Sequence, residues 1–188
     1  MARLYAWSVP LEREALRVAL DLADISPGNR VLDVATGTGA LLRELDKRDL
    51  RAIRAIGIDR SRAMLAEAER VLRDAALVEA DARALPFPDG CFDVITVSYL
   101  LHLLGPEDRA VALSEVRRVL HPGGRAVFVT IDSSERTVRS LLKNLPRWTT
   151  LRRIDLSSEL DARGLRLVAT RYTRPFWPST CLLAQRTN

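Results

Sequence analysis

The stretch from Val31 to Ala40, VLDVATGTGA, has the residue types of a ligand-binding loop. An apolar run leads into a loop in which two glycines alternate with threonine, and a helical pattern follows at once. Glycine permits a positive φ and lets a ligand approach the backbone with no Cβ in the way. The first N–H groups of the next helix are unpaired and carry the positive end of the helix dipole. Together these features predict a cofactor cradle at the carboxyl end of a first parallel strand.

Strand and helix patterns alternate along the chain, and these elements must position the loop. The predicted strands cover residues 30–34, 53–58, 77–80, 92–98 and 125–131, and the predicted helices cover 10–24, 41–48, 61–73 and 106–120. This alternation predicts a parallel α/β sheet with helices on both faces. Asp59 and Asp81 follow two of the strands, so we expect both acids at the carboxyl edge of the sheet, where ligands collect.

The C-terminal part departs from this alternation. Residues 132–154 are interpreted as an irregular basic connection, followed by a short helix over 157–163 that Gly164 ends. Two further strands, 165–172 and 180–186, are joined by a segment too short for a crossover helix, so they must be antiparallel. The expected fold is a doubly wound, seven-stranded, mostly parallel α/β sheet with a C-terminal antiparallel hairpin.

We expect a single domain over residues 1–188. Its parts are a helical segment and partial lid (1–29), the core (30–131), and a short insertion, helix and hairpin (132–188).

The composition of the chain narrows the classes of partner and site that it can have. The 188 residues carry a net charge of +5 and almost all basic residues are arginine, but no run of five like charges points to nucleic acid. We interpret the charge as a solvated basic surface, with nucleic acid a disfavoured partner. Cys91 and Cys181 form no metal or disulfide pattern, so no metal is expected. The absence of a long apolar run and of a signal peptide predicts no membrane span and a cytoplasmic location.

Four motifs, in this order, resemble the class I S-adenosylmethionine (SAM)-dependent methyltransferases, and in particular the ubiquinone/menaquinone-biosynthesis type of small-molecule enzyme. They are DVATGTG at 33–39, GIDRS at 57–61 with Met64 and Leu65, ADARALPFPDGCFD at 80–93, and LHPGG at 120–124. The resemblance covers about residues 30–131 and implies a Rossmann-like fold, with SAM as cofactor and S-adenosylhomocysteine as product. Ala35 departs from the family's pattern, because it stands where the first glycine of the motif would be.

The resemblance implies a role for each acid. Asp59 would accept hydrogen bonds from both ribose hydroxyls; alternatively, it caps the next helix. Asp81 would accept from the adenine amine while the N–H of Ala82 reaches the ring; alternatively, it stabilises its loop. Asp33 would orient either the amino group of the methionine part or the loop itself. The expected cofactor-binding residues are Asp33, Ala35, Thr36, Gly37, Gly39, Asp59, Arg60, Asp81, Ala82 and Ser98.

The resemblance also places the residues after the fourth strand near the reacting methyl group. Methyl transfer is an in-line displacement, so the main contribution of a protein is to align the reactants. A base is needed only where the acceptor loses a proton, and histidine suits that role. His102 and Tyr99 are the predicted catalytic residues, and the alternative for His102 is an inert, half-buried histidine. Asp93 begins the fourth strand, away from this edge, and is expected to be structural.

The acceptor is expected to be a small molecule. The two segments expected to form a lid over it, residues 1–9 and 132–154, are short. Short lids favour an open site that a second copy of the chain completes as a homodimer. Methylation of RNA or protein is an alternative, but no Asn/Asp-Pro-Pro-Tyr motif follows the fourth strand. A non-catalytic SAM-binding protein is another alternative. A nicotinamide-cofactor enzyme is disfavoured, because a G-x-G-x-x-G motif beginning at Gly37 would need glycine where Leu42 stands.

Overall fold

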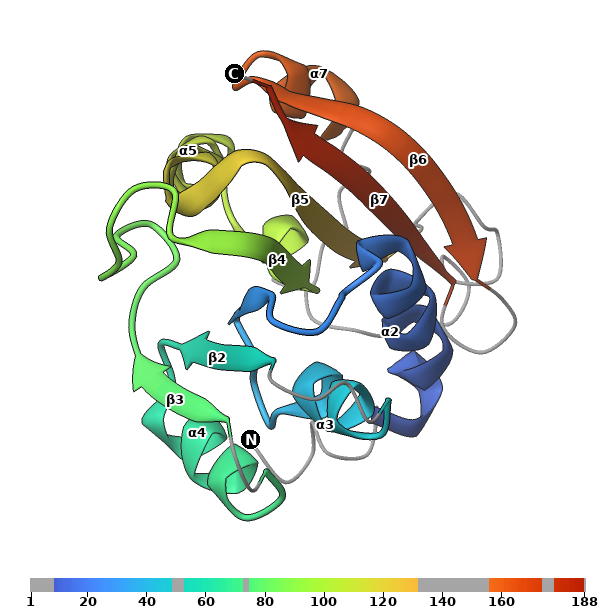
Figure 1. Ribbon diagram of the computed structural model, residues 1–188, viewed down its shortest axis with the longest axis vertical. Helices are drawn as coiled ribbons and strands as arrows, with labels where there is room; N and C mark the ends of the chain where they lie inside the picture. The colour runs from blue at the N-terminus through green and yellow to red at the C-terminus, as the bar shows by residue number, and fades with distance from the viewer. Residues whose placement is uncertain (1–8, 49–52, 73–74, 132–155, 174–177, 188) are drawn as a thin grey trace.

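The described strands form one sheet, which curves through the middle of the molecule (Figure 1). This computed structural model describes residues 9–48, 53–72, 75–131, 156–173 and 178–187, so both expected lid segments, before residue 9 and over 132–154, lie outside the described residues. The strands are β1 (Arg30–Val34), β2 (Arg54–Asp59), β3 (Ala76–Glu79), β4 (Phe92–Ser98), β5 (Leu120–Ile131), β6 (Leu165–Thr173) and β7 (Ser179–Arg186).

The order of the strands is β3-β2-β1-β4-β5-β7-β6. The first five strands pair in parallel, whereas β7 lies antiparallel between β5 and β6. The chain therefore proceeds outward from β1 to β3 and then returns to the other side of β1 at β4. The predicted seven-stranded, doubly wound sheet with a C-terminal antiparallel hairpin is confirmed.

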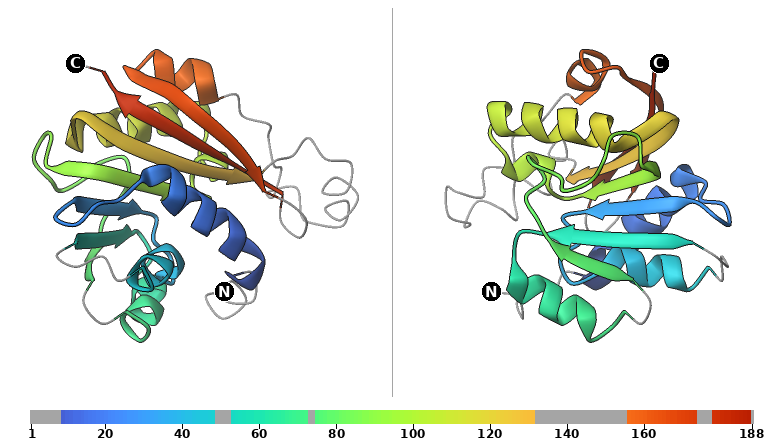
Figure 2. Two further views of the ribbon diagram at one scale, coloured as in Figure 1. Left: turned by 45° about the vertical axis from the view of Figure 1, so that its right-hand side comes forward. Right: turned by 60° about the vertical axis from the view of Figure 1, so that its left-hand side comes forward.

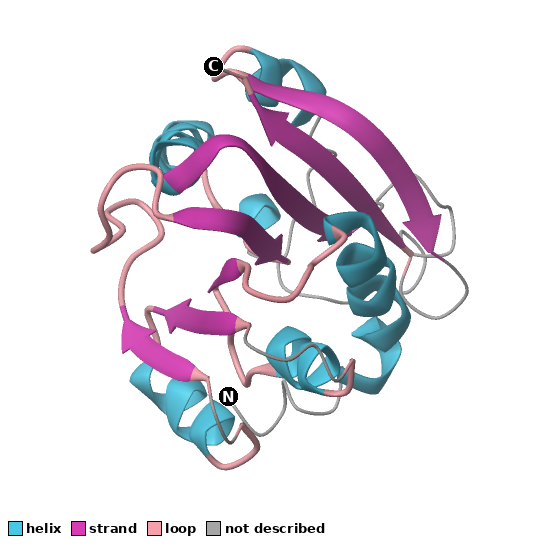
Figure 3. Ribbon diagram, viewed as in Figure 1, coloured by secondary structure: helices cyan, strands magenta, loops and turns pink. Residues whose placement is uncertain are grey.

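Helices cover both faces of this sheet (Figures 2 and 3). The helical elements are α2 (Val9–Ala23), α3 (Ala40–Asp46), α4 (Arg62–Glu69), η1 (Leu101–Leu103), α5 (Pro106–Val119) and α7 (Leu156–Asp161). Alternate strand residues divide between two buried apolar clusters, because successive side chains on a strand point to opposite faces. Val127 and Val129 pack with α2 and α3, whereas Ala126 and Phe128 pack with α5 and α7.

One boundary differs from the prediction for a clear physical reason. The strand expected to begin at Arg125 begins instead at Leu120, which pairs with Phe92. The ladder then skips to the pair Arg125 and Val94, so the four intervening residues form a bulge inside β5. Gly124 is buried at this bulge, where a Cβ would come within 2.8 Å of the carbonyl oxygen of His121. The predicted break is therefore a local irregularity of the strand.

The carboxylate of Glu44 joins α3 to α2. Its side chain is 8% exposed and accepts hydrogen bonds from Arg13 Nε (2.7 Å), Arg17 Nε (3.0 Å) and Lys47 Nζ (2.5 Å). Burial alone would raise the pKa of this carboxyl, but the three cations outweigh it and lower the pKa from 4.5 to about 2. The ionised form therefore stabilises the packing of α2, which forms one wall of the cleft described below.

We expect Glu44→Gln to lower the free energy of unfolding by about 1–2 kcal/mol at pH 7, because charge-assisted hydrogen bonds are lost. Because the pKa is lowered in the folded protein, this contribution to stability is fully present above pH 4.5. It is lost as the pH falls toward about 2. Urea unfolding at several pH values measures the difference between the proteins. Glu14→Gln, at an exposed position of α2, is the control. A difference that stayed constant down to pH 2 would contradict the role of the charge.

Candidate functional site

A cleft opens where the chain changes direction in the sheet, between the carboxyl ends of β1 and β4. In doubly wound sheets this switch point is the usual place for a ligand. The enclosed part of the cleft has a volume of about 50 Å³, and α2 closes one side of it. Its lining residues are Glu12, Leu16, Asp33, Ala35, Thr36, Gly37, Thr38, Ala40, Leu41, Ser98 and Tyr99.

The glycine loop after β1 is held in a left-handed backbone conformation. Ala35, Gly37 and Gly39 have φ angles of 58°, 57° and 76°. A Cβ on Gly39 would come within 2.8 Å of the side chain of Leu72, so this glycine allows the loop to pack closely beneath the cleft. A Cβ on Gly37 would meet nothing within 4 Å, so the backbone there is open to a ligand.

We expect Ala35→Gly to raise the free energy of unfolding by about 0.5–1 kcal/mol. Alanine at φ 58° carries a left-handed strain that glycine does not, which outweighs the greater entropy of glycine in the unfolded chain. Chemical denaturation measures this change. Ala66→Gly in α4 is the control, and it should lose about 1 kcal/mol because its backbone is helical. A loss of stability in both variants would contradict the assigned strain.

Asp59, at the end of β2, connects the glycine loop to the beginning of α4. Its Oδ2 accepts a hydrogen bond from the N–H of Gly37 (2.9 Å), and its Oδ1 accepts from the N–H of Ser61 (2.8 Å). The contact with Ser61 closes a local turn two residues on, whereas a helix-capping acid would accept from N–H groups inside the first turn of α4. An ionised carboxylate offers about four acceptor positions, so two remain for a ligand. Asp59 therefore orders the loop and still presents acceptors beside it.

Asp81 follows β3 by two residues and is bound by Arg83. Its oxygens accept from the N–H (2.9 Å), Nε (3.0 Å) and Nη2 (2.6 Å) of Arg83. Arg83, with a smaller contribution from Arg60, lowers the pKa of this carboxyl to about 2. These are the contacts of a loop-stabilising acid, and they leave about one acceptor position for a ligand. Ala82 lies in the same turn, half-buried against the core.

Asp33 is the most buried acid that lines the cleft, with 1% of its surface exposed. The hydroxyl of Thr96 donates a hydrogen bond of 2.7 Å to its Oδ1. Burial raises the pKa of this carboxyl from 3.8 to about 6, and the negative charge of Asp59 acts in the same direction. No cation of a described residue pairs with Asp33, and such a buried carboxylate is suited to receive a positively charged group of a ligand.

Ser98 and Tyr99 form the opposite wall of the cleft, at the end of β4. The hydroxyl of Ser98 is buried and has no hydrogen-bond partner among the described residues. Tyr99 has a φ of 56°, unusual for an aromatic residue, and its hydroxyl is 3.0 Å from Ser179 Oγ on β7. The hydroxyl of Tyr99 therefore ties this wall of the cleft to the C-terminal hairpin.

His102 lies in η1, a short 3-10 turn between β4 and α5, and is not among the residues that line the cleft. Its ring packs edge-on against Tyr99, with the ring centroids 6.5 Å apart. Burial lowers the pKa of this histidine from 6.5 to about 4, and its Nδ1 has no partner among the described residues. The imidazole is therefore neutral at pH 7, one contact away from the cleft.

Of the residues expected to bind a ligand, Asp33, Ala35, Thr36, Gly37 and Ser98 line one cleft. Asp59, Arg60, Asp81 and Ala82 continue this edge past β2 and β3, while Gly39 packs beneath the loop. Asp93 lies at the start of β4 and binds the guanidinium and N–H of Arg30, a structural contact as expected.

Sequence reasoning did not identify Glu12 as a cleft residue. Glu12 is 6% exposed and lines the cleft from α2. It precedes the buried Ala15, Leu16 and Ala19 by three, four and seven residues, which places it on the buried face of the helix. An acid on the apolar face of an amphipathic helix was the available signal.

Comparison with known proteins gives a family match over half of the chain: the model described as "Methyltransferase domain" matches residues 31–124. The demethylmenaquinone methyltransferase of Beutenbergia cavernae is 42% identical over 127 residues, covering 67% of this chain and 50% of the relative. The ubiquinone/menaquinone biosynthesis C-methyltransferase UbiE of Geobacter sulfurreducens is 36% identical over 136 residues, covering 67% and 51%. The chain thus spans about half the length of the curated relatives it matches.

A solved structure shares the fold at low sequence identity. The crystal structure of the [4+2]-cyclase SpnF superimposes with a TM-score of 0.74 at 21% identity, covering 93% of this chain and 81% of that one. Within the described residues, no helix is long and apolar enough to span a membrane. The same residues contain no group of three or more His, Cys, Asp or Glu side chains that could hold a metal ion.

Proposed function

Because this chain belongs to the methyltransferase domain family, we propose that it binds SAM in the cleft and methylates a small-molecule acceptor. The observation that carries the proposal is the convergence of Asp33, the open backbone of Gly37 and the unpartnered Ser98 hydroxyl at the switch point. Fold alone would not decide the reaction, since one fold hosts many activities.

The chemistry of the cleft fits SAM. Asp33 is a buried carboxylate suited to the amino group of the methionine part, and Gly37 leaves space for close approach. Asp59 has free acceptor positions for the ribose hydroxyls, and Asp81 has one for the adenine amine. The buried hydroxyl of Ser98 would find in the ligand the polar partner that it lacks among the described residues. When bound, SAM supplies a methyl group already activated by a positively charged sulfur.

The protein's part in the reaction is to align the acceptor and, where needed, to remove a proton. Holding two reactants in line replaces an encounter in solution and lowers the barrier. Tyr99, fixed at the cleft by its hydrogen bond to Ser179, presents a rigid wall for this alignment. His102 is neutral at pH 7 and its Nδ1 has no partner among the described residues, so we propose it as the acceptor of the proton lost on methylation; burial makes it a weaker base than an exposed imidazole.

We expect His102→Ala to leave the affinity for SAM within about twofold and to lower kcat by about 100-fold or more, the usual contribution of a general base. Calorimetry measures the affinity, and transfer of a radiolabelled methyl group measures kcat. Leu103→Ala, an exposed position on the same turn, is the control. An equal loss of affinity and rate in His102→Ala would assign this histidine a structural role.

We propose a quinone-type small molecule as the acceptor class. The relatives from Beutenbergia cavernae and Geobacter sulfurreducens are named for methylation in menaquinone and ubiquinone biosynthesis, and each matches 67% of this chain. The test is methyl transfer to a water-soluble demethylated naphthoquinol, with tRNA as a parallel acceptor. Turnover on tRNA alone would favour the RNA alternative. SAM binding without turnover on a wide acceptor panel would favour a non-catalytic protein.

The homodimer and the cytoplasmic location stay predictions. Sedimentation analysis tests the homodimer.

The cofactor is tested first, by calorimetry against SAM, S-adenosylhomocysteine and NAD. Micromolar binding of the first two with none of NAD supports the proposal. Binding of NAD alone, or of none of the three, would contradict it.

A further inference from the structure

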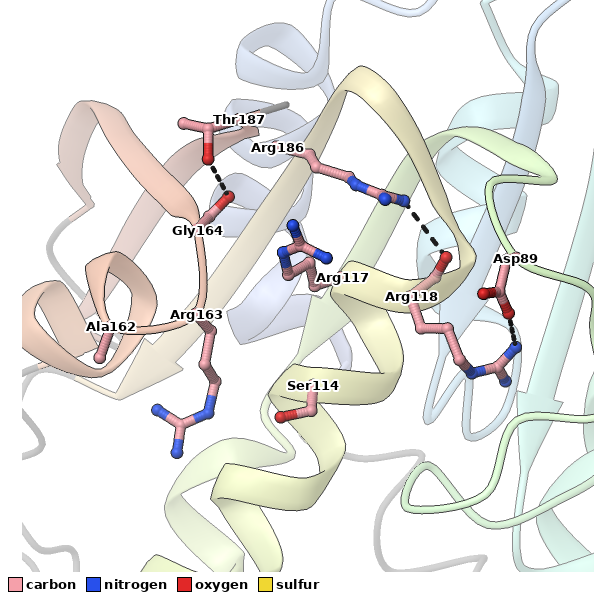
Figure 4. Close-up of a pocket in the computed structure, with 9 residues that line it drawn as sticks. All are labelled: Asp89, Ser114, Arg117, Arg118, Ala162, Arg163, Gly164, Arg186 and Thr187. Atoms are coloured by element: carbon pink, nitrogen blue, oxygen red, sulfur yellow. Dashed lines mark hydrogen bonds and ion pairs between the residues drawn. The ribbon is translucent and has the colours of Figure 1, made fainter.

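A second pocket lies at the opposite edge of the sheet from the cleft, where β7 ends beside the beginning of β5 (Figure 4). The end of α5, the turn between α7 and β6, and the end of β7 form its walls. It is a wide, solvent-open concavity with a volume of about 610 Å³, and none of its lining residues is aromatic. These residues are Asp89, Ser114, Arg117, Arg118, Ala162, Arg163, Gly164, Arg186 and Thr187.

The pocket holds four arginines, and Arg118 is the only one that pairs with acids of the described residues. Arg118 pairs with Glu115 (2.7 Å) and Asp89 (2.8 Å) and also donates to two carbonyls of the loop before β4. Arg118 therefore links the loop before β4 to α5 and holds its own charge in these ion pairs.

The other three arginines of the pocket have no carboxylate partner among the described residues. Arg163 donates to the carbonyls of Ala110 (3.1 Å) and Glu159 (2.7 Å). Arg186 donates to carbonyls at the end of α5, and its Nε is buried without a partner. Carbonyls satisfy hydrogen bonds but do not cancel charge, so the pocket keeps a positive field that a concave surface concentrates.

Arg117 differs from the other arginines of the pocket, because it donates to no backbone carbonyl among the described residues. It makes no hydrogen bond or ion pair with any described residue, although it is half-buried between Gly164 and Arg186 (Figure 4). A Cβ on Gly164 would come within 3.0 Å of Arg117 Nε and within 3.1 Å of Thr187 Oγ1. Glycine at this turn thus leaves room for a guanidinium that has no partner in the described part of the chain.

The chemistry of these walls selects the ligand. Guanidinium groups present forked N–H donors that match the oxygens of phosphate. The four guanidiniums and the two carboxylates that pair with Arg118 leave a net charge of +2, which matches a dianion better than a single carboxylate. No aromatic side chain is available for stacking a nucleobase. We propose that this pocket is a binding site for a phosphate or diphosphate group, centred on Arg117 and separate from the cofactor cleft.

The test is calorimetric titration of the full chain with inorganic phosphate and with diphosphate, at constant ionic strength set with sodium chloride. We expect binding by the natural protein, and Arg117→Gln should weaken it by about tenfold or more, because charge-assisted hydrogen bonds are lost. Ser114→Asp, which places a negative charge on the pocket wall, should abolish it. Arg54→Gln replaces an exposed arginine on β2 that does not line the pocket, and this variant should bind as the natural protein does. Thermal unfolding without phosphate checks that each variant folds.

A parallel arm uses vesicles that contain phosphatidic acid. Binding of the soluble anions identifies a free ligand, whereas vesicle binding that is lost in Arg117→Gln identifies a phosphate carried by a lipid headgroup; both support the site. Equal binding by Arg117→Gln and the natural protein, or no binding in either arm, would overturn it and leave the arginines as caps of α5. SAM affinity, measured on the same samples, reports on the cleft separately.

Discussion

Asp59→Ala should weaken SAM binding by about 2–4 kcal/mol, or roughly 30-fold to 1,000-fold, because two charge-assisted hydrogen bonds to the ribose are lost. The structure adds a second cause. The carboxylate also accepts from the N–H groups of Gly37 and Ser61, so its removal releases the loop that must lie against the ligand. Calorimetry with SAM and S-adenosylhomocysteine measures the loss, which should be similar for both because they share the ribose.

Two matched variants separate the causes. Asp59→Asn keeps one acceptor oxygen and should fall between the natural protein and the alanine variant. Glu79→Ala removes an exposed acid from the neighbouring strand, at the position that pairs with Asp59, and should bind SAM normally. If Asp59→Ala bound SAM as tightly as Glu79→Ala, Asp59 would only order the two loops that it contacts, and the assigned cofactor orientation would be wrong.

The strands that carry the site could be predicted because their sequences allow little else. The strands Arg30–Val34 and Phe92–Ser98 have the predicted bounds. Both are runs of apolar and β-branched residues between turn or polar residues, and both are buried on two faces, as central parallel strands require. The order of their motifs along the chain was enough to bring Asp33 and Ser98 into one cleft.

Features that depend on distant contacts could not be predicted in the same way. The insertion of β7 between β5 and β6 has no local signal, because a hairpin can pair with the sheet through either of its strands. The bulge in β5 resembles a loop, since Pro122 and Gly123 have turn chemistry although the strand continues on both sides. The hydrogen bond between Tyr99 and Ser179 joins residues 80 positions apart, and the left-handed φ of Tyr99 likewise has no local signal in the sequence.

The position of His102 illustrates the same limit. Its place after the fourth strand was clear from the motif order, but its burial, and hence its low pKa, depends on packing that the sequence does not encode locally. The arginine pocket is a further case, because its arginines come from α5, the α7–β6 turn and β7. Only the folded chain shows that three of them share one concavity while pairing with no carboxylate of a described residue.

The affinity for SAM should depend on pH through Asp33. In the free protein, burial holds the pKa of Asp33 at about 6, so the carboxyl is mostly neutral at pH 5 and mostly ionised at pH 7. An ammonium group binds the ionised form, and the amino group of the ligand stays protonated over this range. The affinity should therefore rise by about tenfold between pH 5 and pH 7, because binding at the lower pH must first remove a proton. His102, with a pKa of about 4, changes little in this window.

Asp33→Asn tests this assignment because the amide keeps an acceptor for Thr96 but cannot ionise. The variant should bind SAM about 10-fold to 150-fold more weakly at pH 7 and lose the pH dependence. Its folding stability should move in the opposite direction. A raised pKa means that the natural fold loses stability as the pH rises from about 4 to about 6, a loss that the neutral amide avoids. Weak binding by a variant at least as stable as the natural protein would place the ammonium on Asp33. Weak binding with a less stable loop, and with the pH dependence intact, would instead show that Asp33 only orients the glycine loop.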